Sequence, residues 1–454
     1  MAPSAPTIRD RALCDLLNSE LICALGCTEP IAVAYAAALA RHVLGAEPVR
    51  LSVRCSGNII KNVKSVIVPN SDGMRGVEAA AVLGAVGGNA AGALEVLEGV
   101  DDADRARTRE LLARGGYCDV ILAEGVPNLY IDVRAQAAGH VAEVAISGHH
   151  THVVCCTLDG RPVSTCCPMA KGSRAGACAD AADAVPATPN PTQAQPALPG
   201  LSLAAILGFA AAGDIEPARE ALERQLRLNA AISAEGLAHP WGAEVGRILL
   251  ATRGDDLACR ARARAAAGSD ARMGGCALPV AIVCGSGNQG ITACLPVLTY
   301  AEELGVEGDD LLRALALSDL VAIHVKSYIG ALSAFCGVVC AACGAGAAIT
   351  WMSGGTLEQV GATVVNTLGN VGGIVCDGAK ASCAAKISAA VDAAILGHDM
   401  ALAGRGFKAG EGVVQETVEQ TIAAMGYVGR VGMQPTDVEI LNIMIGKTDV
   451  EGAC

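Results

Sequence analysis

The stretch Leu332–Thr350 reads LSAFCGVVCAACGAGAAIT, and the stretch Gly372–Lys386 reads GGIVCDGAKASCAAK. Together they hold five cysteines: Cys336, Cys340, Cys343, Cys376 and Cys383. No charged residue lies between Lys326 and Glu358, which predicts a helix buried inside a large helical core. Thiols in such a setting are either small apolar core side chains or ligands of a soft metal centre such as an iron–sulfur cluster.

The spacing of these cysteines leaves that choice open. On one helix, Cys336, Cys340 and Cys343 would lie at i, i+4 and i+7 and share a face. A redox role for the C-x-x-C pair would need an exposed helix start, and a zinc site would need a second such pair. Cys376 and Cys383 follow a glycine turn, but the standard ferredoxin spacings are absent.

Composition restricts the class of protein. A net charge of −13 argues against a nucleic-acid partner. Twenty cysteines without an apolar signal segment indicate a reducing, cytoplasmic setting. The run from Ser327 to Thr350 is long enough to cross a bilayer, but it is built from Gly, Ala, Ser and Cys without an aromatic belt. We therefore expect no membrane association, and we expect self-association of so apolar a chain into a homo-oligomer.

The pattern of the chain predicts an α+β fold. Residues 1–168 combine helical segments with alternating strands near 49–60, 65–71 and 118–158, which indicates an α+β domain with a small sheet. Residues 169–200 are rich in Ala and Pro and predict a linker or disordered loop. Residues 201–454 predict a larger all-α domain, interrupted by glycine-rich loops such as CGSGNQG at 284–290.

Three polar motifs are candidates for binding small ligands. In Gly26–Glu29, before Pro30, Cys27 and Thr28 are expected at a helix N-terminus, which favours anions. The strand near 49–60 leads into a polar cluster with Asn58, Lys61 and Asn62. In Gly285–Gly290, Ser286, Asn288 and Gln289 suit a carboxylate or an amine, or form a structural turn; no P-loop lysine follows. The run at 149–152, HHTH, is a metal site or, more simply, a strand end with exposed imidazoles.

Eight short stretches, taken in order, resemble the L-cysteine desulfidase family, which is related to the iron–sulfur L-serine dehydratases. They are LGCTEPIA, SGNIIKNVKSVIVP, LGAVGGNA, SDARMGG, GSGNQGITA, LSAFC, IVCDGAKASCAAK and VEQTI. The resemblance covers most of the chain except the segment near 169–200 and the extreme ends. It implies an enzyme with a [4Fe–4S] cluster and without pyridoxal phosphate, which converts L-cysteine to pyruvate, ammonia and sulfide.

The resemblance also implies roles for single residues. The cluster ligands would be Cys336, Cys376 and Cys383, in the all-α domain, and Cys340 and Cys343 would be their packing neighbours. The base would be Cys27, whose helix N-terminus is expected to lower its pKa. The candidates for substrate binding are Thr28, Glu29, Asn58, Lys61, Asn62, Ser286, Asn288 and Gln289. The site would lie where the two domains meet.

Alternatives remain at this stage. Three thiolates leave one iron open as a Lewis acid, and this chemistry would equally expel hydroxide from L-serine or L-threonine. A non-catalytic iron–sulfur or thiol sensor is a third reading, although it would need only the ligands. The terminal Cys454 is a further hypothesis, since it would cap the open iron in the resting enzyme.

Overall fold

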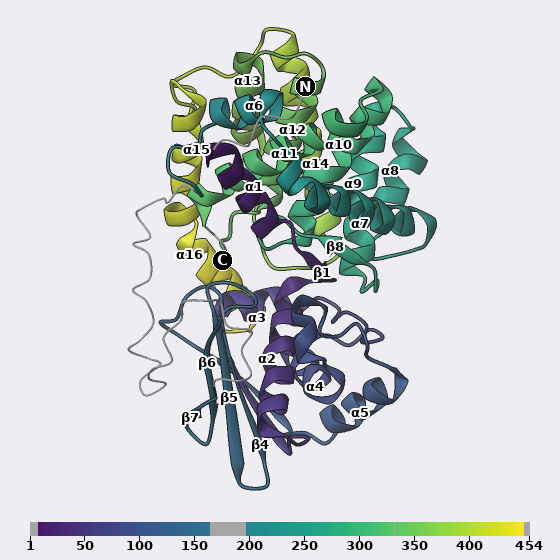
Figure 1. Cartoon of the computed structure of the whole chain (residues 1–454), viewed down its shortest axis with the longest axis vertical. Helices are drawn as coiled ribbons and strands as arrows, with labels where there is room; N and C mark the ends of the chain where they lie inside the picture. Colours follow the sequence, from purple (N-terminus) through teal and green to yellow (C-terminus); the bar gives the residue numbers. More distant parts are fainter. Residues whose placement is uncertain (1–7, 164–196, 331, 449–454) are drawn as a thin grey trace.

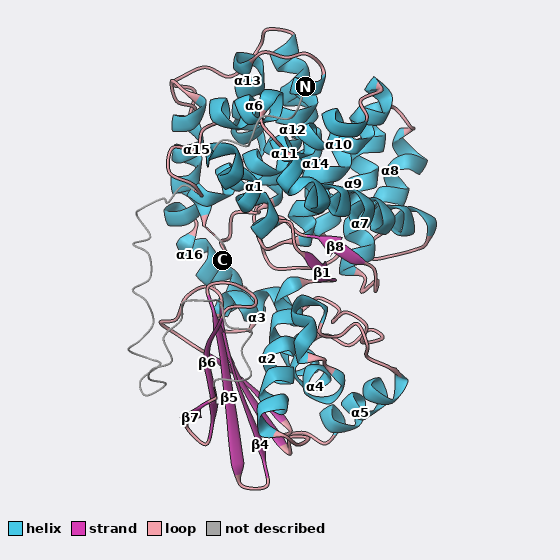
Figure 2. Ribbon diagram, in the orientation of Figure 1, coloured by secondary structure: helices cyan, strands magenta, loops and turns pink. Residues whose placement is uncertain are grey.

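The computed structural model describes residues 8–163, 197–330 and 332–448. The chain forms two lobes (Figure 1), a smaller α+β lobe and a larger helical lobe. Figure 2 shows that the long strands all lie in the smaller lobe. The predicted α+β class, with a small N-terminal sheet and a larger helical region, is confirmed.

The α+β lobe is built on a six-stranded sheet with the order β3-β2-β4-β5-β6-β7, in which β2 and β3 are parallel and all other pairs are antiparallel. Along β2 exposure alternates, as expected for a sheet with one face against a core. The strands are β2 (Arg50–Cys55), β3 (Cys118–Leu122), β4 (Tyr130–Ala137), β5 (His140–Ser147), β6 (Val153–Leu158) and β7 (Arg161–Pro162).

Helix α2 (Thr28–Leu44) packs between this sheet and α4 (Gly76–Gly87). It is buried from Thr28 to Ala40, so its sequence is apolar on all sides. The backbones of α2 and α4 approach closely at Gly84, where a Cβ would lie 2.3 Å from the Ala34 carbonyl oxygen. The lobe is completed by α3 (Gly57–Val63), α5 (Asp102–Ala113) and a 3-10 helix, η1 (Ala90–Glu95).

The helical lobe surrounds α12 (Val338–Met352), whose residues Val338 to Thr350 are all buried. Gly344 lets α11 approach, since a Cβ there would lie 2.1 Å from the Ser318 carbonyl oxygen. The lobe contains α6 (Leu203–Ala212), η2 (Glu216–Ala218), α7 (Arg219–Ala238), α8 (Val245–Arg253), α9 (Leu257–Met273), α10 (Gly287–Leu304), α11 (Gly308–Ile329), α13 (Leu357–Val371), α14 (Cys383–Leu402), α15 (Val418–Tyr427) and η3 (Val428–Gly432).

Both ends of the described chain cross between the lobes. Helix α1 (Ile8–Glu20) packs in the helical lobe against α11 and η2, and β1 (Cys23–Leu25) pairs with β8 (Pro279–Ala281) before α2 begins. At the other end α16 (Gln434–Met444) packs against α3. The predicted segment 169–200 lies largely outside the described residues, as does Cys454.

Four local predictions from the sequence were wrong. The segment 65–71 makes only an isolated bridge, between Ile67 and Arg75, and no strand. The polar cluster after β2 is the short helix α3, and the predicted loop at 284–290 becomes α10 from Gly287 onward. The apolar run from Ser327 to Thr350 is divided between α11, a loop and α12. None of the helices in the described parts of the chain is long and apolar enough to span a membrane.

Candidate active site

A cavity of about 520 Å³ lies at the junction of the two lobes. Eleven of the twelve residues selected from the sequence line it, from segments that are hundreds of residues apart. They are Cys27, Glu29, Asn58, Lys61, Asn62, Ser286, Asn288, Gln289, Cys336, Cys376 and Cys383. Thr28 is fully buried behind the wall, where its hydroxyl lies 3.0 Å from the Gly285 carbonyl oxygen and joins the two polar turns.

A short antiparallel contact sets two of the thiols side by side. Phe335 and Val375 form an isolated bridge, in which the Cys336 N–H donates to Ile374 O at 2.9 Å and the Cys376 N–H donates to Ala334 O at 2.6 Å. Helix α12 begins only at Val338. The expectation that Cys336 shares a helix face with Cys340 and Cys343 was therefore wrong, and these two lie fully buried in the helical core.

The third thiol comes from the first residue of α14, Cys383, at the end of the loop that begins with Cys376. This loop crosses α3 so closely that a Cβ on Gly378 would lie 2.3 Å from the Lys61 carbonyl oxygen, and Gly378 has φ +92°. Only glycine suits both conditions. Asp377 holds the loop through ion pairs with Lys380 and Lys386.

The three thiols influence one another's pKa through hydrogen bonding and electrostatic interaction. The Cys336 thiol donates a hydrogen bond to the Cys376 sulfur, which lowers the pKa of Cys376 to about 6, against the effect of burial and with help from Lys61. The same hydrogen bond and burial raise the pKa of Cys336 well above its usual value. Burial raises the pKa of Cys383. Within this group, then, one thiol is poised to ionise and two are held neutral.

Four helices begin at the cavity wall. The residues at or just before the first turns of α2, α10, α12 and α14 are Cys27, Ser286, Cys336 and Cys383, and all four line the cavity. The N-terminus of a helix offers free N–H groups and a positive dipole end. The wall as a whole therefore favours anionic groups such as thiolates and carboxylates.

Cys27 and Glu29 form a buried pair at the start of α2. The Cys27 thiol donates to Glu29 Oε2 at 3.2 Å, and Asn62 Nδ2 donates to Glu29 Oε1 at 2.9 Å. Burial alone would raise the pKa of Glu29, but His150, the Cys27 thiol and Arg272 outweigh it and hold that pKa below its usual value. Glu29 is thus a carboxylate that accepts from the thiol beside it.

The expected lowering of the Cys27 pKa was wrong. Burial first, and then the negative charge of Glu29, raise the pKa of Cys27 well above its usual value, although Arg272 opposes them. Helix position alone suggested a thiolate, but the Glu29 backbone N–H lowers the pKa of Cys27 by less than burial and the Glu29 charge raise it. The resting side chain is a thiol with a carboxylate as its acceptor.

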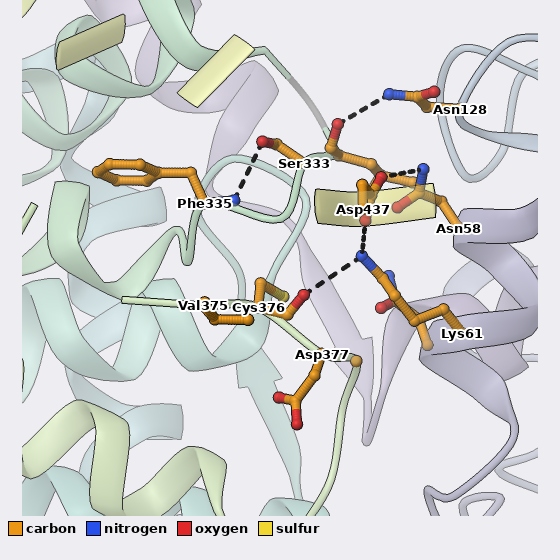
Figure 3. A network of polar contacts seen from close by, with 12 residues as sticks. Asn58, Lys61, Asn128, Ser333, Phe335, Val375, Cys376, Asp377 and Asp437 are labelled. Carbon is orange, nitrogen blue, oxygen red and sulfur yellow. Dashed lines mark hydrogen bonds and ion pairs between the residues drawn. The ribbon is translucent and has the colours of Figure 1, made fainter. Parts of the chain in front are cut away.

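A second buried pair joins three distant segments, as Figure 3 shows. Lys61 Nζ forms an ion pair with Asp437 of α16 and lies 3.4 Å from the Cys376 carbonyl oxygen. Asn58 Nδ2 donates to the other oxygen of Asp437 at 2.9 Å. The last helix, the helix α3 and the Cys376 loop are thereby held together at one edge of the cavity.

Several side chains that line the cavity also carry a buried polar atom without a protein partner. Within the described parts of the chain, five buried atoms of its lining side chains accept no hydrogen bond: Asn58 Oδ1, Asn62 Oδ1, Asn288 Oδ1, Gln289 Oε1 and His150 Nε2. Buried polar groups normally find partners, and each one left without a partner costs free energy. Such a concentration indicates a site for a small molecule that donates several hydrogen bonds.

Comparison with known proteins agrees with this geometry. The serine dehydratase alpha chain family matches residues 94–442, which include all three thiols and Asp437. Relatives match over nearly their full length. A UPF0597 protein of Lachnoclostridium phytofermentans is 46% identical over 96% of this chain and 99% of its own, and one of Desulfitobacterium hafniense is 44% identical over 95% and 96%.

The chain belongs to the serine dehydratase alpha chain family. The donor set of this family member suits an iron–sulfur cluster, because three soft thiols from two loops face one cavity. Among the described residues, no three His, Cys, Asp or Glu side chains converge tightly enough for a single metal ion.

Four residues of this family member's site were not selected from the sequence. Arg272, whose Nε donates to Gly26 O at 2.9 Å, lies in a quoted motif, SDARMGG, but no role was assigned to it. Lys326 is the only charge in a long apolar run, which is a usable signal. His150 lies in the HHTH run and enters the cavity wall. No local pattern marks Asp437.

Proposed function

We propose that this protein is a β-eliminating lyase that acts on a small L-amino acid through a [4Fe–4S] cluster and without pyridoxal phosphate. The observation that carries the proposal is the cavity itself. It combines three thiols, a thiol–carboxylate pair and several unpartnered polar atoms within about 520 Å³, which is room for a substrate of this size beside a cofactor.

Proton removal is assigned to Cys27 together with Glu29. Because Cys27 is a thiol, it accepts the substrate's α-proton only as its own proton leaves. Glu29 Oε2, 3.2 Å from the sulfur, is the acceptor for that proton. The α-proton thus moves to sulfur, the thiol proton moves to the carboxylate, and the C–H electron pair forms the Cα–Cβ double bond as the β-substituent departs with its own electron pair.

The other polar residues would orient the substrate. The free amide oxygens of Asn62, Asn288 and Gln289 suit an ammonium group, which donates three hydrogen bonds. A cluster held by Cys336, Cys376 and Cys383 would supply a Lewis-acidic iron, because three thiolates leave one of four irons without a protein ligand. The eliminated aminoacrylate hydrolyses to pyruvate and ammonia.

Two leaving groups are supported by different observations. The ordered motifs resemble L-cysteine desulfidases and favour sulfide, so L-cysteine is the proposed substrate. The serine dehydratase alpha chain family favours hydroxide, so L-serine, or L-threonine, is the second candidate. The elimination is the same in both cases.

The deciding experiment is anaerobic reconstitution with iron and sulfide, followed by assays with L-cysteine, L-serine and L-threonine separately. Pyruvate and sulfide in equal amounts from L-cysteine, without added pyridoxal phosphate, are expected. Pyruvate from L-serine alone would make the protein a dehydratase. A bound cluster without a keto acid from any substrate would contradict the lyase proposal and favour a sensor.

A further inference from the structure

Lys326 is the charged residue of the cavity wall that the proposed mechanism does not use. It lies in the last turn of α11, is 6% exposed and lines the same cavity as Cys336. It is also the only charged residue between Asp319 and Glu358. A single buried lysine in this otherwise uncharged stretch needs an explanation, because burying an ammonium group without a partner costs free energy.

The three cations of the cavity differ in what they contact. Lys61 is paired with Asp437 and also meets the Cys376 carbonyl oxygen. Arg272 donates to Gly26 O and faces the Cys27–Glu29 pair. The Lys326 ammonium group has no hydrogen-bond or ion-pair partner anywhere in residues 8–163, 197–330 and 332–448, although the Lys61 and Arg272 side chains, which line the same cavity, have theirs.

The surroundings of Lys326 compensate its charge only in part. Its place near the C-terminus of α11 gives a favourable interaction with the helix dipole. It opposes the effect of burial on the thiols of Cys284 and Cys340, which shows that its charge acts on this side of the cavity. An acceptor at hydrogen-bonding distance is still missing among the described residues, so the ammonium group is available to an anion that enters the cavity.

We propose that Lys326 binds the α-carboxylate of the substrate and so restricts the cavity to amino acids with a free carboxylate. This inference rests on the proposed function for its substrate class. It agrees with the polar atoms elsewhere in the wall: acceptors at Asn62, Asn288 and Gln289 for an ammonium group, and one unpaired cation for a carboxylate. An amino-acid zwitterion has the matching groups, since its ammonium group donates to these acceptors and its carboxylate pairs with this cation.

The test compares Lys326→Gln and Lys326→Arg with Lys408→Gln, which removes the same charge from an exposed loop. Calorimetry of each reconstituted protein with L-alanine and L-alaninamide measures the preference for a carboxylate without turnover, since neither ligand has a β-leaving group. We expect the wild type and Lys408→Gln to prefer L-alanine by about 10- to 100-fold. Lys326→Gln should lose the preference, and Lys326→Arg should keep most of it.

Kinetics give a second measurement. Lys326→Gln should raise KM for the substrate by about 10- to 100-fold and leave kcat within about threefold, because the carboxylate is bound equally before and during elimination. An unchanged preference for L-alanine in Lys326→Gln, or no preference in the wild type, would overturn the inference. A Lys326-dependent preference in a protein that releases no keto acid would instead retain the inference and reject the proposed function.

Discussion

The two walls of the cavity are organised differently. On the α+β side, Glu29 accepts from Cys27 and Asn62, and Lys61 is paired with Asp437, so the charges are satisfied within the protein. On the helical side, the thiols face one another and Lys326 has no partner among the described residues. The first wall is preorganised for proton transfer, and the second presents groups that bind a ligand.

The largest effect is expected from the thiols. Cys336→Ala, Cys376→Ala and Cys383→Ala should each reduce iron in the reconstituted protein to background and abolish turnover, because each removes a ligand. Metal analysis and visible absorption measure this. Cys340→Ala is the matched control: it removes a fully buried thiol from α12, outside the cavity, and should retain iron. Equal iron loss in the control would contradict the assignment of ligands.

The second effect concerns the proton-transferring wall. Cys27→Ala and Glu29→Gln should each lower kcat by about 10²- to 10⁴-fold while the iron content stays unchanged. The chain provides a control, because Cys23 donates to Glu95 at 3.1 Å in a similar pair that does not line the cavity. Cys23→Ala should keep wild-type kcat. Full activity in Glu29→Gln would exclude the coupled transfer.

A smaller effect is expected where the walls join. Asp437→Asn removes the carboxylate that Lys61 and Asn58 share, and should destabilise the protein by about 3 kcal/mol, since it leaves a buried ammonium without its partner. Iron should also dissociate faster, because Lys61 contacts the Cys376 carbonyl. Thermal unfolding and timed iron release are the measurements. Asp119→Asn, which breaks an exposed pair with Arg50, should change stability by less than about 1 kcal/mol.

A different kind of effect, on the pH dependence of stability, separates two buried carboxylates. Glu29 has cationic and thiol neighbours, whereas Asp319 in the helical core is hydrogen-bonded by Gln225 alone among the described residues, and burial raises the pKa of Asp319 to about 8. The native state therefore binds one more proton than the unfolded state between about pH 4 and 8, and stability should fall by at most about 1.4 kcal/mol per pH unit across that window.

Asp319→Asn should remove this pH dependence, so the midpoint of thermal unfolding should fall less between pH 5 and pH 8 in the variant than in the wild type. The exposed Asp309→Asn variant is the control and should follow the wild type at both values. If Asp319→Asn and the wild type lose stability in parallel between pH 5 and pH 8, the neutral form of Asp319 is not the native one.

Much of the fold could be predicted because periodicity reports burial. The long helices and the strands β4 to β6 follow that pattern. It fails at 65–71, where apolar residues are buried by packing and not by strand pairing, and at Gly287, where glycines permit close packing at a helix start. A Cβ on Gly287 would lie 2.4 Å from Arg272 Nε.

The sequence predicted which residues line the site better than it predicted their protonation states and long-range contacts. Motif resemblance located eleven lining residues, but the state of Cys27 depends on burial and on the position of Glu29, which only the folded geometry specifies. Lys61 and Asp437 are 376 residues apart in the chain, and no local signal links them. Contacts of this range are visible only once the lobes are assembled.

Because both ends of the described chain cross between the lobes, the chain cannot easily be cut into two independent fragments, and the lobes cannot easily swing apart. Leu13, Leu17 and Leu21 of the first segment belong to the core of the helical lobe, while α16 from the far end is fastened to α3. The helical lobe is therefore not a contiguous piece of sequence, and the α+β lobe is held at α3 by the far end of the chain. A gene cut after the α+β lobe would separate α1 from the helical core and α16 from α3. The same interlacing opposes a wide hinge motion, so substrate should enter by small side-chain and loop movements.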